Sequence, residues 1–373
     1  MILEELRNRL TQLDRELIAL VAERQRIVAD IGAHKIATAA PTRDYDRERV
    51  VLDGARAQAA QLSLDPDVAE RIMLELIRAS LTHQELTRVA AVNTGAGKRA
   101  LIIGGAGAMG AWFGRFLASQ GYAVEVADPV PGTFGFAQVA DWRDSDLGHE
   151  LIVVATPISA SNDVLKALAA AKPAGVIFDL GSLKTPLRDG LQALVEAGCR
   201  VTSLHPMFGP DTRLLSERHV VIVDLGAADA AQYARELFGS TMATLVEMSV
   251  DEHDRLIAYV LGLSHALNLA FFTALAHSGE FVRRLMRMSS TTFDAQVDVA
   301  RRVALDNPHL YFEIQTLNDF GSESLHALRD ATTRIIELVD ARDEDGFVEL
   351  MRSGREYVAM REEGQREPVA GSA

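Results

Sequence analysis

The chain of 373 residues is poor in cysteine, lysine and positive charge. A single cysteine, Cys199, excludes an internal disulfide and a cysteine-based zinc site, and it is expected to be a small buried residue in a reducing compartment. The first residues, Met-Ile-Leu-Glu-Glu-Leu-Arg, lack the basic start and apolar run of a signal peptide, which predicts a cytoplasmic location.

Acidic side chains outnumber basic ones. Lys and Arg together number 38 against 52 Asp and Glu, so the net charge is −14. Such a field repels phosphate backbones and acidic lipid, which argues against nucleic acid or a membrane surface as partners. Five of the basic residues are lysines. Lys98, Lys166 and Lys172 are expected at the surface, whereas Lys35 and Lys184 lie in segments that bear on function.

A hydrophobic content of 48% over this length predicts two or three domains and excludes a disordered chain. The longest apolar segment, Leu256 to Ala276, is long enough to cross a bilayer. It contains Ser264, His265 and Asn268, and its flanks show no clear charge asymmetry. A buried core helix or a dimer-interface helix is therefore predicted instead of a membrane span.

Two cations interrupt the apolar face of the first predicted helix. Leucine and isoleucine recur at alternating steps of three and four from position 3 to position 31. At position 24, where this spacing calls for an apolar residue, the chain has Arg24. Lys35 lies eleven residues further, which is about three helical turns and about 20° from the direction of Arg24. Long basic side chains often reach solvent from such positions, so this face alone does not establish a site.

The next two segments supply further polar groups. Pro41 ends the first helix, and Asp44 with Glu48 opens a second one. A third helix is predicted after Asp65-Pro66, with Ser80 and Gln84 on one face. Three helices would thus offer cations, a carboxylate and an amide to one interior cavity.

These residues resemble the all-helical chorismate mutases. The motifs, in order, are Leu6-Arg7, Ala22-Glu23-Arg24, Gly32-Ala-His-Lys35, Arg43-Asp44-Tyr-Asp-Arg47-Glu48 and Ser80-Leu-Thr-His-Gln84. The resemblance implies an intertwined dimer of three-helix chains that converts chorismate to prephenate, a pericyclic rearrangement. It also implies roles for individual residues. Arg24, Arg47, Ser80 and Arg7 of the partner chain would hold carboxylates, Glu48 with Asp44 nearby would accept the ring hydroxyl, and Lys35 and Gln84 would donate to the ether oxygen.

A glycine-rich turn follows a short flexible linker at residues 93–98. The apolar strand Arg99 to Ile103 leads into Gly104-Gly105-Ala-Gly107-Ala-Met-Gly110 and then into a helical pattern. A G-x-G-x-x-G motif between a strand and a helix predicts a dinucleotide-binding fold, with backbone N–H groups facing a pyrophosphate. The expected cofactor contacts in this turn are Gly105, Gly107, Ala108, Met109 and Gly110.

The second strand, Tyr122 to Ala127, ends at Asp128, where an acidic residue would bind the adenosine ribose. Since no Arg or Lys follows to meet a 2′-phosphate, NAD is predicted over NADP; an ordinary turn aspartate is the alternative for Asp128. Further strands at 151–155, 176–180 and 220–225 predict a doubly wound sheet. Their ends would bring Thr156-Pro157, Lys184 and the His205-Pro206 loop to the cofactor crevice.

The loop His205-Pro-Met-Phe-Gly-Pro and the turn Gly181-Ser-Leu-Lys184 resemble the prephenate dehydrogenases. The resemblance implies that His205 polarises the ring hydroxyl of prephenate while hydride leaves for NAD and carbon dioxide departs. It further implies a helical dimerisation domain in which His265 lies beside the substrate and Arg302 binds a prephenate carboxylate, with Arg301 as the alternative. The consecutive run Asp251-Glu-His253-Asp254 is interpreted as a solvated helix start and not as a metal site.

The predicted organisation is therefore an all-α mutase-like domain at 1–92, a linker at 93–98, an α/β Rossmann NAD-binding domain at 99–249 and an all-α dimerisation domain at 250–373. The two halves together resemble the bifunctional chorismate mutase/prephenate dehydrogenases of tyrosine biosynthesis. Two alternatives stay open at this point: the first ninety residues could serve only for dimerisation, and arogenate could replace prephenate. Tyrosine is a candidate feedback inhibitor, and no metal is predicted.

Overall fold

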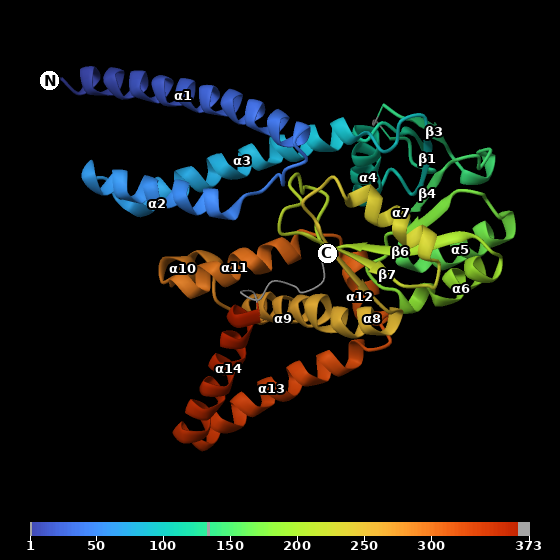
Figure 1. Cartoon of the computed structure of the whole chain (residues 1–373). Helices are drawn as coiled ribbons and strands as arrows, with labels where there is room; N and C mark the ends of the chain where they lie inside the picture. Colours follow the sequence, from blue (N-terminus) through green and yellow to red (C-terminus); the bar gives the residue numbers. More distant parts are fainter. Residues whose placement is uncertain (1, 133–134, 365–373) are drawn as a thin grey trace. The chain divides into compact units, whose positions relative to one another are not determined.

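The structure is a computed structural model that describes residues 2–132 and 135–364 (Figure 1). Residue contacts divide the chain into two compact units, Met1–His253 and Asp254–Ala373. The first unit contains three long helices followed by a sheet with flanking helices, and the second unit is helical.

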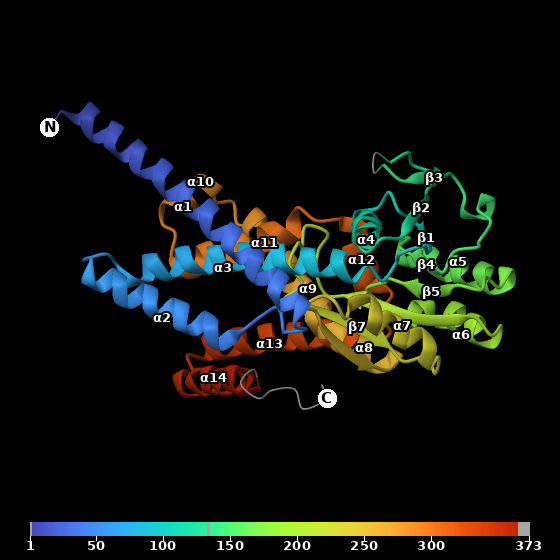
Figure 2. The same ribbon diagram turned by 45° about the horizontal axis from the view of Figure 1, so that its top comes forward.

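The three N-terminal helices are α1 (Leu3–Ala37), α2 (Tyr45–Gln61) and α3 (Pro66–Val92), as the sequence predicted. The side chain of Asp44 accepts the N–H of Arg47 and so caps α2, and Asp65 caps α3 in the same way ahead of Pro66. Helix α3 packs against both α1 and α2. The N-terminal part of α1 extends away from the other two helices (Figures 1 and 2).

The segment at 93–98, predicted as a linker, forms a turn between α3 and β1. Asn93 ends α3 with a left-handed backbone, and the N–H of Gly95 donates to the carbonyl of Gln120 at 2.8 Å. Gly95 is buried against the ring of Tyr122, so closely that a Cβ there would lie 2.0 Å from a ring carbon. Because only glycine fits this contact, the turn holds α3 against the sheet domain.

In the described part of the chain, eight strands form one sheet in the order β3-β2-β1-β4-β5-β6-β7-β8. Neighbouring strands are parallel except that β7 runs antiparallel to β6. The chain crosses from β3 to β4 beside β1, which is the switch point where doubly wound sheets bind ligands. The strands are β1 (Arg99–Ile103), β2 (Ala123–Ala127), β3 (Ala137–Val139), β4 (Leu151–Val154), β5 (Val176–Asp179), β6 (Arg200–Pro206), β7 (His219–Val223) and β8 (Thr244–Met248).

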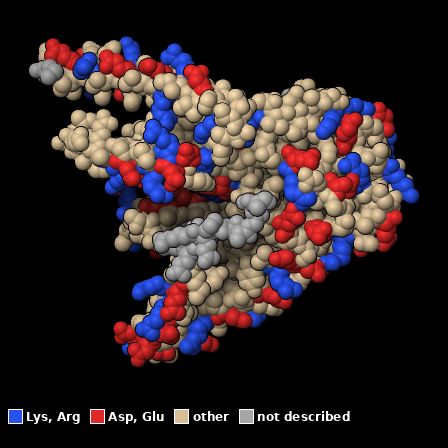
Figure 3. All heavy atoms as spheres, in the orientation of Figure 1, with Lys and Arg blue, Asp and Glu red and all other residues tan. Residues whose placement is uncertain are grey.

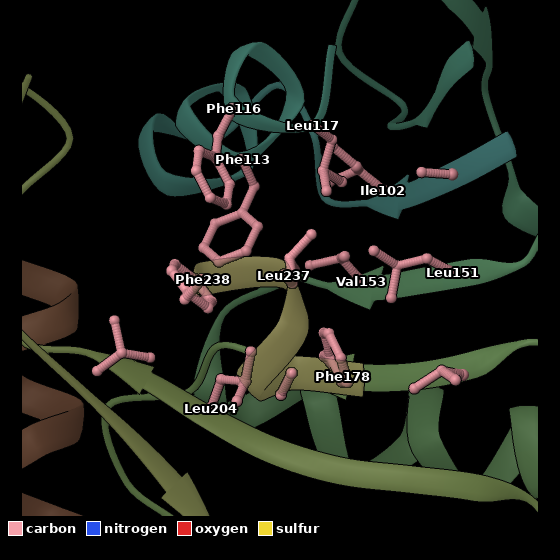
Figure 4. Packing of buried hydrophobic residues seen from close by; sticks show 14 of the residues in the cluster. Ile102, Phe113, Phe116, Leu117, Leu151, Val153, Phe178, Leu204, Leu237 and Phe238 are labelled. Atoms are coloured by element: carbon pink, nitrogen blue, oxygen red, sulfur yellow. The ribbon is translucent and has the colours of Figure 1, made fainter. Parts of the chain in front are cut away.

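Four helices and two 3₁₀ turns connect the strands. They are α4 (Ala108–Ser119), η1 (Trp142–Asp144), α5 (Ile158–Ala171), η2 (Thr185–Leu187), α6 (Arg188–Glu196) and α7 (Ala228–Phe238). Phe116 of α4 stacks on Phe238 of α7 at 5.2 Å, and Phe113 meets the same ring edge-on at 6.3 Å (Figure 4). Strands β1, β4 and β5 are buried on both faces, which explains their continuous apolar runs.

The second unit is built from helices that follow the sheet domain. They are α8 (Val250–Ile257), which spans the boundary, a π-helical segment η3 (Ala258–Leu263), α9 (Ser264–His277), α10 (Val282–Arg287), α11 (Thr291–Ala304), α12 (Pro308–Thr316), α13 (Gly321–Ala341) and α14 (Glu344–Gly364). Within this unit α9 packs against α11, and Gln296 donates to Asn268 at 2.9 Å.

The apolar segment Leu256 to Ala276 is not a buried core helix. It is interrupted by η3, and only 22% of the apolar window in Val250–His277 is buried inside the chain. Its length and composition would allow it to cross a membrane, which by itself is weak evidence for a span. A dimer interface is the prediction that stays open for it. Acidic and basic side chains are interspersed over the visible face (Figure 3).

Candidate active sites

Seven of the eight residues predicted for the mutase site line one cavity of about 620 Å³ between α1, α2 and α3. They are Arg24, Lys35, Asp44, Arg47, Glu48, Ser80 and Gln84. The apolar wall includes Val28, Ile77 and Leu81, all buried. The two cations in the apolar face of α1 therefore point into a cavity and not to solvent.

Arg24 is anchored to α3. Its Nη1 donates to Oγ of Ser80 at 2.8 Å and to the carbonyl of Leu76 at 3.2 Å. Burial lowers the pKa of Arg24 from its ordinary value, but a guanidinium stays charged at neutral pH. The arrangement presents a fixed, partly desolvated cation of the kind that binds a carboxylate in a fork.

Lys35 and Gln84 carry polar atoms that are suited to a ligand. Nζ of Lys35 donates to the carbonyl of Thr42 at 2.7 Å. Oε1 of Gln84 is buried and has no hydrogen-bond partner among the residues that the structure describes. A Cβ at Gly32 would lie 3.0 Å from Cγ of Gln84, so glycine leaves room for this side chain against α1. A buried polar atom without a partner is costly unless a ligand or water satisfies it.

Glu48 is shared between the cavity and a neighbouring arginine. Its carboxylate accepts Nε and Nη2 of Arg43, both at 3.0 Å in their shorter contacts. Asp44 lines the same cavity, with Oδ1 accepting the N–H of Arg47. Both carboxylates are thus oriented by hydrogen bonds before any ligand binds.

Arg7 is the predicted mutase residue that does not line this cavity. Its side chain is 66% exposed and lies 3.7 Å from Glu4 on the outer part of α1. The resemblance assigned Arg7 to the site of a partner chain, and its exposure on α1 is compatible with that assignment.

The glycine-rich turn joins β1 to α4 as predicted. Gly104 has φ +86°, and a Cβ there would lie 2.7 Å from the carbonyl oxygen of Ala155. A Cβ at Gly110 would lie 2.4 Å from the carbonyl oxygen of Gly104, so α4 can approach the turn only with glycine there. Gly107 stands at the N-cap of α4. This close-packed turn before a helix N-terminus fits a dinucleotide pyrophosphate.

Asp128 and Thr156 lie at the ends of β2 and β4, on either side of β1. Oδ2 of Asp128 accepts the N–H of Ala106 at 3.0 Å, which ties the carboxylate to the glycine-rich turn. Its other oxygen accepts the N–H of Val130, so Asp128 also serves as a turn residue. Thr156 contacts Ser161 at 2.8 Å, and Pro157 is the N-cap of α5.

His205 lies within β6 and pairs with Val221 of β7, so its assignment to a loop is corrected. It is 4% exposed, and its Nδ1 is 2.9 Å from Nε2 of His253. Burial lowers the pKa of His205 well below its ordinary value, with His253 and Lys184 adding to the effect. The imidazole is therefore neutral at physiological pH, which suits a hydrogen-bond acceptor.

His253 is 1% exposed and Asp254 is fully buried, so the interpretation of a solvated helix start is wrong for these two residues, whereas Asp251 and Glu252 are exposed. The burial of His253 was not predicted because it stands among four consecutive polar residues, and a helical turn of that composition is usually exposed. The signal was Ile257, an apolar residue four positions after His253 on the same face of the helix, and it is buried as His253 is.

Lys184 is fully buried and pairs with Asp179 at 2.8 Å. Its Nζ also donates to the carbonyl of Leu204, the residue before His205, at 2.8 Å. Asp179 accepts the N–H of Gly181 at 2.9 Å as well. Lys184 therefore ties the end of β5 to the strand that carries His205 and adds positive charge beneath it.

His265 and Arg302 belong to the second unit. The ring of His265 stacks on Tyr311 with centroids 4.0 Å apart, and within residues 2–132 and 135–364 its buried Nδ1 has no hydrogen-bond partner. Burial lowers the pKa of His265, and burial also raises the pKa of Tyr311 to about 12. The π-helical segment just before Ser264 is the kind of irregularity that often marks a functional site. Arg301 and Arg302 are both exposed at the end of α11.

Three family models match the chain in succession. Residues 6–85 match chorismate mutase type II, residues 134–247 match the nucleotide-binding domain of prephenate dehydrogenase, and residues 249–353 match the prephenate dehydrogenase dimerization domain. The glycine-rich turn lies before the second match, so its assignment to dinucleotide binding rests on the geometry of Gly104, Gly107 and Gly110.

Similar proteins show the same arrangement. The chain is 27% identical to the T-protein of Enterobacter agglomerans over 93% of this chain and 90% of that protein. It is 24% identical to the T-protein of Haemophilus influenzae over 95% of this chain and 92% of that protein. The fold matches a crystal structure of prephenate dehydrogenase from Aquifex aeolicus in complex with hydroxyphenyl propionate and NAD+, with 18% identity, a TM-score of 0.57, and coverage of 70% of this chain and 98% of that one. The chain thus belongs to the bifunctional chorismate mutase/prephenate dehydrogenases of tyrosine biosynthesis.

Proposed function

We propose that the cavity between α1, α2 and α3 rearranges chorismate to prephenate with the residues that line it. The reaction is pericyclic and needs no nucleophile, so the protein must hold the reactive conformer and stabilise charge on the ether oxygen. Arg24, Arg47 and Ser80 bind carboxylates, while Glu48, with Asp44 beside it, accepts the ring hydroxyl. The observation that carries this proposal is the convergence of seven predicted residues on one cavity.

Lys35 and Gln84 act on the ether oxygen. The ammonium of Lys35 is a compact donor, and turning it from the carbonyl of Thr42 to the ligand exchanges one hydrogen bond for another. The amide of Gln84 on α3 supplies the second donor, after it turns its nitrogen to the place that Oε1 occupies.

Replacing Lys35 by Ala tests the mutase proposal. Loss of a preorganised donor to developing charge reduces kcat about 100- to 1,000-fold. Chorismate disappearance is measured for the wild type, for Lys35→Ala and for the exposed control Lys166→Ala, which keeps full activity. An inactive wild type, or an unaffected Lys35→Ala variant, would leave the helices with a role in dimerisation only.

The dehydrogenase site uses NAD, which supplies the hydride acceptor. Gly105, Gly107, Ala108, Met109 and Gly110 hold the pyrophosphate at the N-terminus of α4. Asp128 binds the adenosine ribose, as an acidic residue does at the end of the second strand. Thr156 and Pro157 line the crevice at the end of β4.

His205 accepts the proton of the ring hydroxyl of prephenate. As the C–H bond of that carbon breaks, bound NAD would take up the hydride, and the carbon is left as a carbonyl. The bond to the ring carboxylate then breaks and carbon dioxide leaves. The electron pair of that bond enters the ring, which becomes aromatic, and the carbonyl oxygen takes its proton back from His205 to give 4-hydroxyphenylpyruvate. A neutral, buried imidazole with Nδ1 bound to His253 leaves Nε2 as the nitrogen for this contact.

His265 and Arg302 bind prephenate from the second unit. The guanidinium of Arg302 is exposed, and among the described residues it makes no ion pair, so it is available to bind a substrate carboxylate. The unpartnered Nδ1 of His265 is available to a polar ligand atom. The substrate is prephenate and not arogenate because the same chain makes prephenate.

A homodimer completes the mutase cavity. Leu3, Leu6, Leu10, Leu13 and Leu17 are 44% to 61% exposed along α1, and a second copy would cover them. The partner would then bring its own Arg7 to the carboxylates. We also propose a cytoplasmic location for the protein and tyrosine as a feedback inhibitor, since the end product resembles the aromatised substrate.

A coupled assay tests the two activities together. Chorismate and NAD are supplied, and NADH formation is followed for the wild type and for His205→Asn. The variant is expected to lose most NADH formation while chorismate still disappears at the wild-type rate. Equal loss of both activities would show that His205 maintains the fold instead of the chemistry.

A further inference from the structure

The loop Met207–Arg218 joins β6 to β7 and begins two residues after His205. We call it the β6–β7 loop. Two side chains from the first 92 residues hold it, although it belongs to the sheet domain: Glu85 of α3, and Arg43 from the segment between α1 and α2. The loop therefore connects the catalytic strand of the dehydrogenase with the mutase cavity.

Glu85 of α3 provides the first attachment. It is 3% exposed, and its two oxygens accept the N–H of Leu215 at 2.8 Å and that of Met242 at 2.6 Å. The preceding residue, Gln84, lines the mutase cavity. A buried carboxylate that accepts two backbone N–H groups is a fixed attachment, because releasing either group leaves a buried polar atom without a partner.

Arg43 provides the second attachment, and it is shared. Its Nε and Nη2 bind the carboxylate of Glu48, while Nη1 donates to Oγ of Ser216 at 2.7 Å and to Glu217 at 2.8 Å. The side chains of Arg43 and Glu48 are 18% and 19% exposed, and that of Glu217 is 70% exposed. One guanidinium thus divides its donors between a carboxylate that lines the mutase cavity and the β6–β7 loop.

Trp112 of α4 contacts the loop and can serve as a spectroscopic reporter. Nε1 of Trp112 donates to the carbonyl of Thr212 at 2.8 Å, and its ring lies 5.0 Å from that of Phe208. Glu217 has φ +64°, a strained backbone for a residue with a side chain. A change in how Arg43 holds Ser216 and Glu217 would therefore reach the surroundings of Trp112.

We propose that Arg43 couples the two active sites. When a ligand hydroxyl engages Glu48 in the mutase cavity, Arg43 loses part of that partner and binds Ser216 and Glu217 more tightly, which steadies the loop after His205. The inference rests on the proposed role of Glu48 toward the ring hydroxyl. Since coupling is reciprocal, ligands of the dehydrogenase site change affinity at the mutase cavity by the same factor.

The test uses a bicyclic dicarboxylate analogue of the mutase transition state that bears the ring hydroxyl. NADH formation from prephenate is measured with and without a saturating amount of the analogue, as judged by inhibition of the mutase. The KM for prephenate is expected to fall about fivefold in the wild type, at the lower end of typical coupling. Arg43→Lys should abolish this shift, because an ammonium lacks the fork that binds two partners. Arg49→Lys, an exposed position on α2, is the matched control.

A second variant and a second measurement distinguish loss of coupling from misfolding of the Arg43→Lys variant. Glu217→Gln removes the charge on the loop at an exposed position and should also reduce the KM shift. In a Trp142→Phe background, Trp112 is the single tryptophan. Its emission should respond to the analogue with Arg43 present and not in Arg43→Lys.

The outcomes separate the two proposals. If the analogue inhibits the mutase but leaves the KM and the Trp112 emission of the wild type unchanged, the coupling is overturned and the mutase assignment stands. A KM shift of the same size in Arg43→Lys also overturns it. If Lys35→Ala keeps full mutase activity, the proposed mutase site fails, and the coupling fails with it.

Discussion

Nε2 of His253 lies 2.9 Å from Nδ1 of His205, and both rings are buried. When both imidazoles are neutral, one of these nitrogens donates and the other accepts, so His253 determines which tautomer His205 adopts. The nitrogen of His205 that meets the substrate therefore has its protonation state set by a residue on α8.

Replacing His253 by Phe keeps an aromatic ring at this position and removes the hydrogen bond to His205. The dehydrogenase kcat is expected to fall about 10- to 100-fold, part of what a positioned acid–base group contributes, while mutase activity stays unchanged. Steady-state kinetics of both reactions measure the effect. His219→Asn, at an exposed position on β7, is the control. Unchanged dehydrogenase kinetics would show that His205 needs no partner at Nδ1.

The lowered pKa of His205 predicts the pH dependence of dehydrogenase activity. Because the neutral imidazole is the active form, kcat/KM should stay constant from pH 8 to about pH 6.5, the ordinary value for histidine, and fall only at lower pH. In His253→Phe one of the groups that lower this pKa is lost, so the acid limb should move to higher pH. An acid limb above pH 6.5 in the wild type contradicts the prediction.

The same shift affects stability with a definite sign. Between the folded-state pKa of His205 and 6.5, the unfolded chain binds the proton and the folded chain does not. The contribution of this group to stability is therefore present above pH 6.5 and lost as the pH falls through the folded-state pKa. Urea unfolding midpoints at pH 8, 7, 6 and 5 measure the trend, and His205→Asn should show a weaker one.

Lys184→Met breaks a buried ion pair and leaves Asp179 buried without its cation. The expected cost is about 3–5 kcal/mol of unfolding free energy, measured by urea denaturation. The exposed pair between Lys166 and Asp189 is the matched control, and Lys166→Met should cost no more than about 1 kcal/mol. Adding Asp179→Asn to Lys184→Met should recover part of the loss. A cost equal to that of the control would mean that Asp179 is satisfied without Lys184.

Arg302→Ala is expected to raise the KM for prephenate about 10- to 100-fold with a smaller effect on kcat, because a charge-assisted bond to a carboxylate contributes about 1.5–3 kcal/mol. Arg301→Ala at the neighbouring exposed position is the control. Initial-rate measurements with varied prephenate distinguish the two. If the KM rises in Arg301→Ala instead, the carboxylate is bound one residue earlier.

Local patterns predicted much of the architecture because they reflect local physics. Asp44 and Asp65-Pro66 mark helix starts through hydrogen bonds within a few residues, and both caps form in the structure. The glycine-rich turn before α4 was predicted for the same reason, since close packing around Gly104 and Gly110 tolerates no side chain. The β6–β7 pair was not predicted as antiparallel, because strand direction depends on the whole sheet.

The sequence by itself determined the three-helix pattern with Arg24 and Lys35 in its apolar face, the dinucleotide-binding turn and the order of the domains. These features follow from periodicity, backbone conformation and motif order, which need no distant partner. Only the tertiary structure decided that His253 contacts His205, that Lys184 pairs with Asp179 beneath β6, and that Arg43 binds both Glu48 and the β6–β7 loop. Each of these contacts joins residues from different elements, and a buried polar group is satisfied by whichever partner the packed chain places within reach.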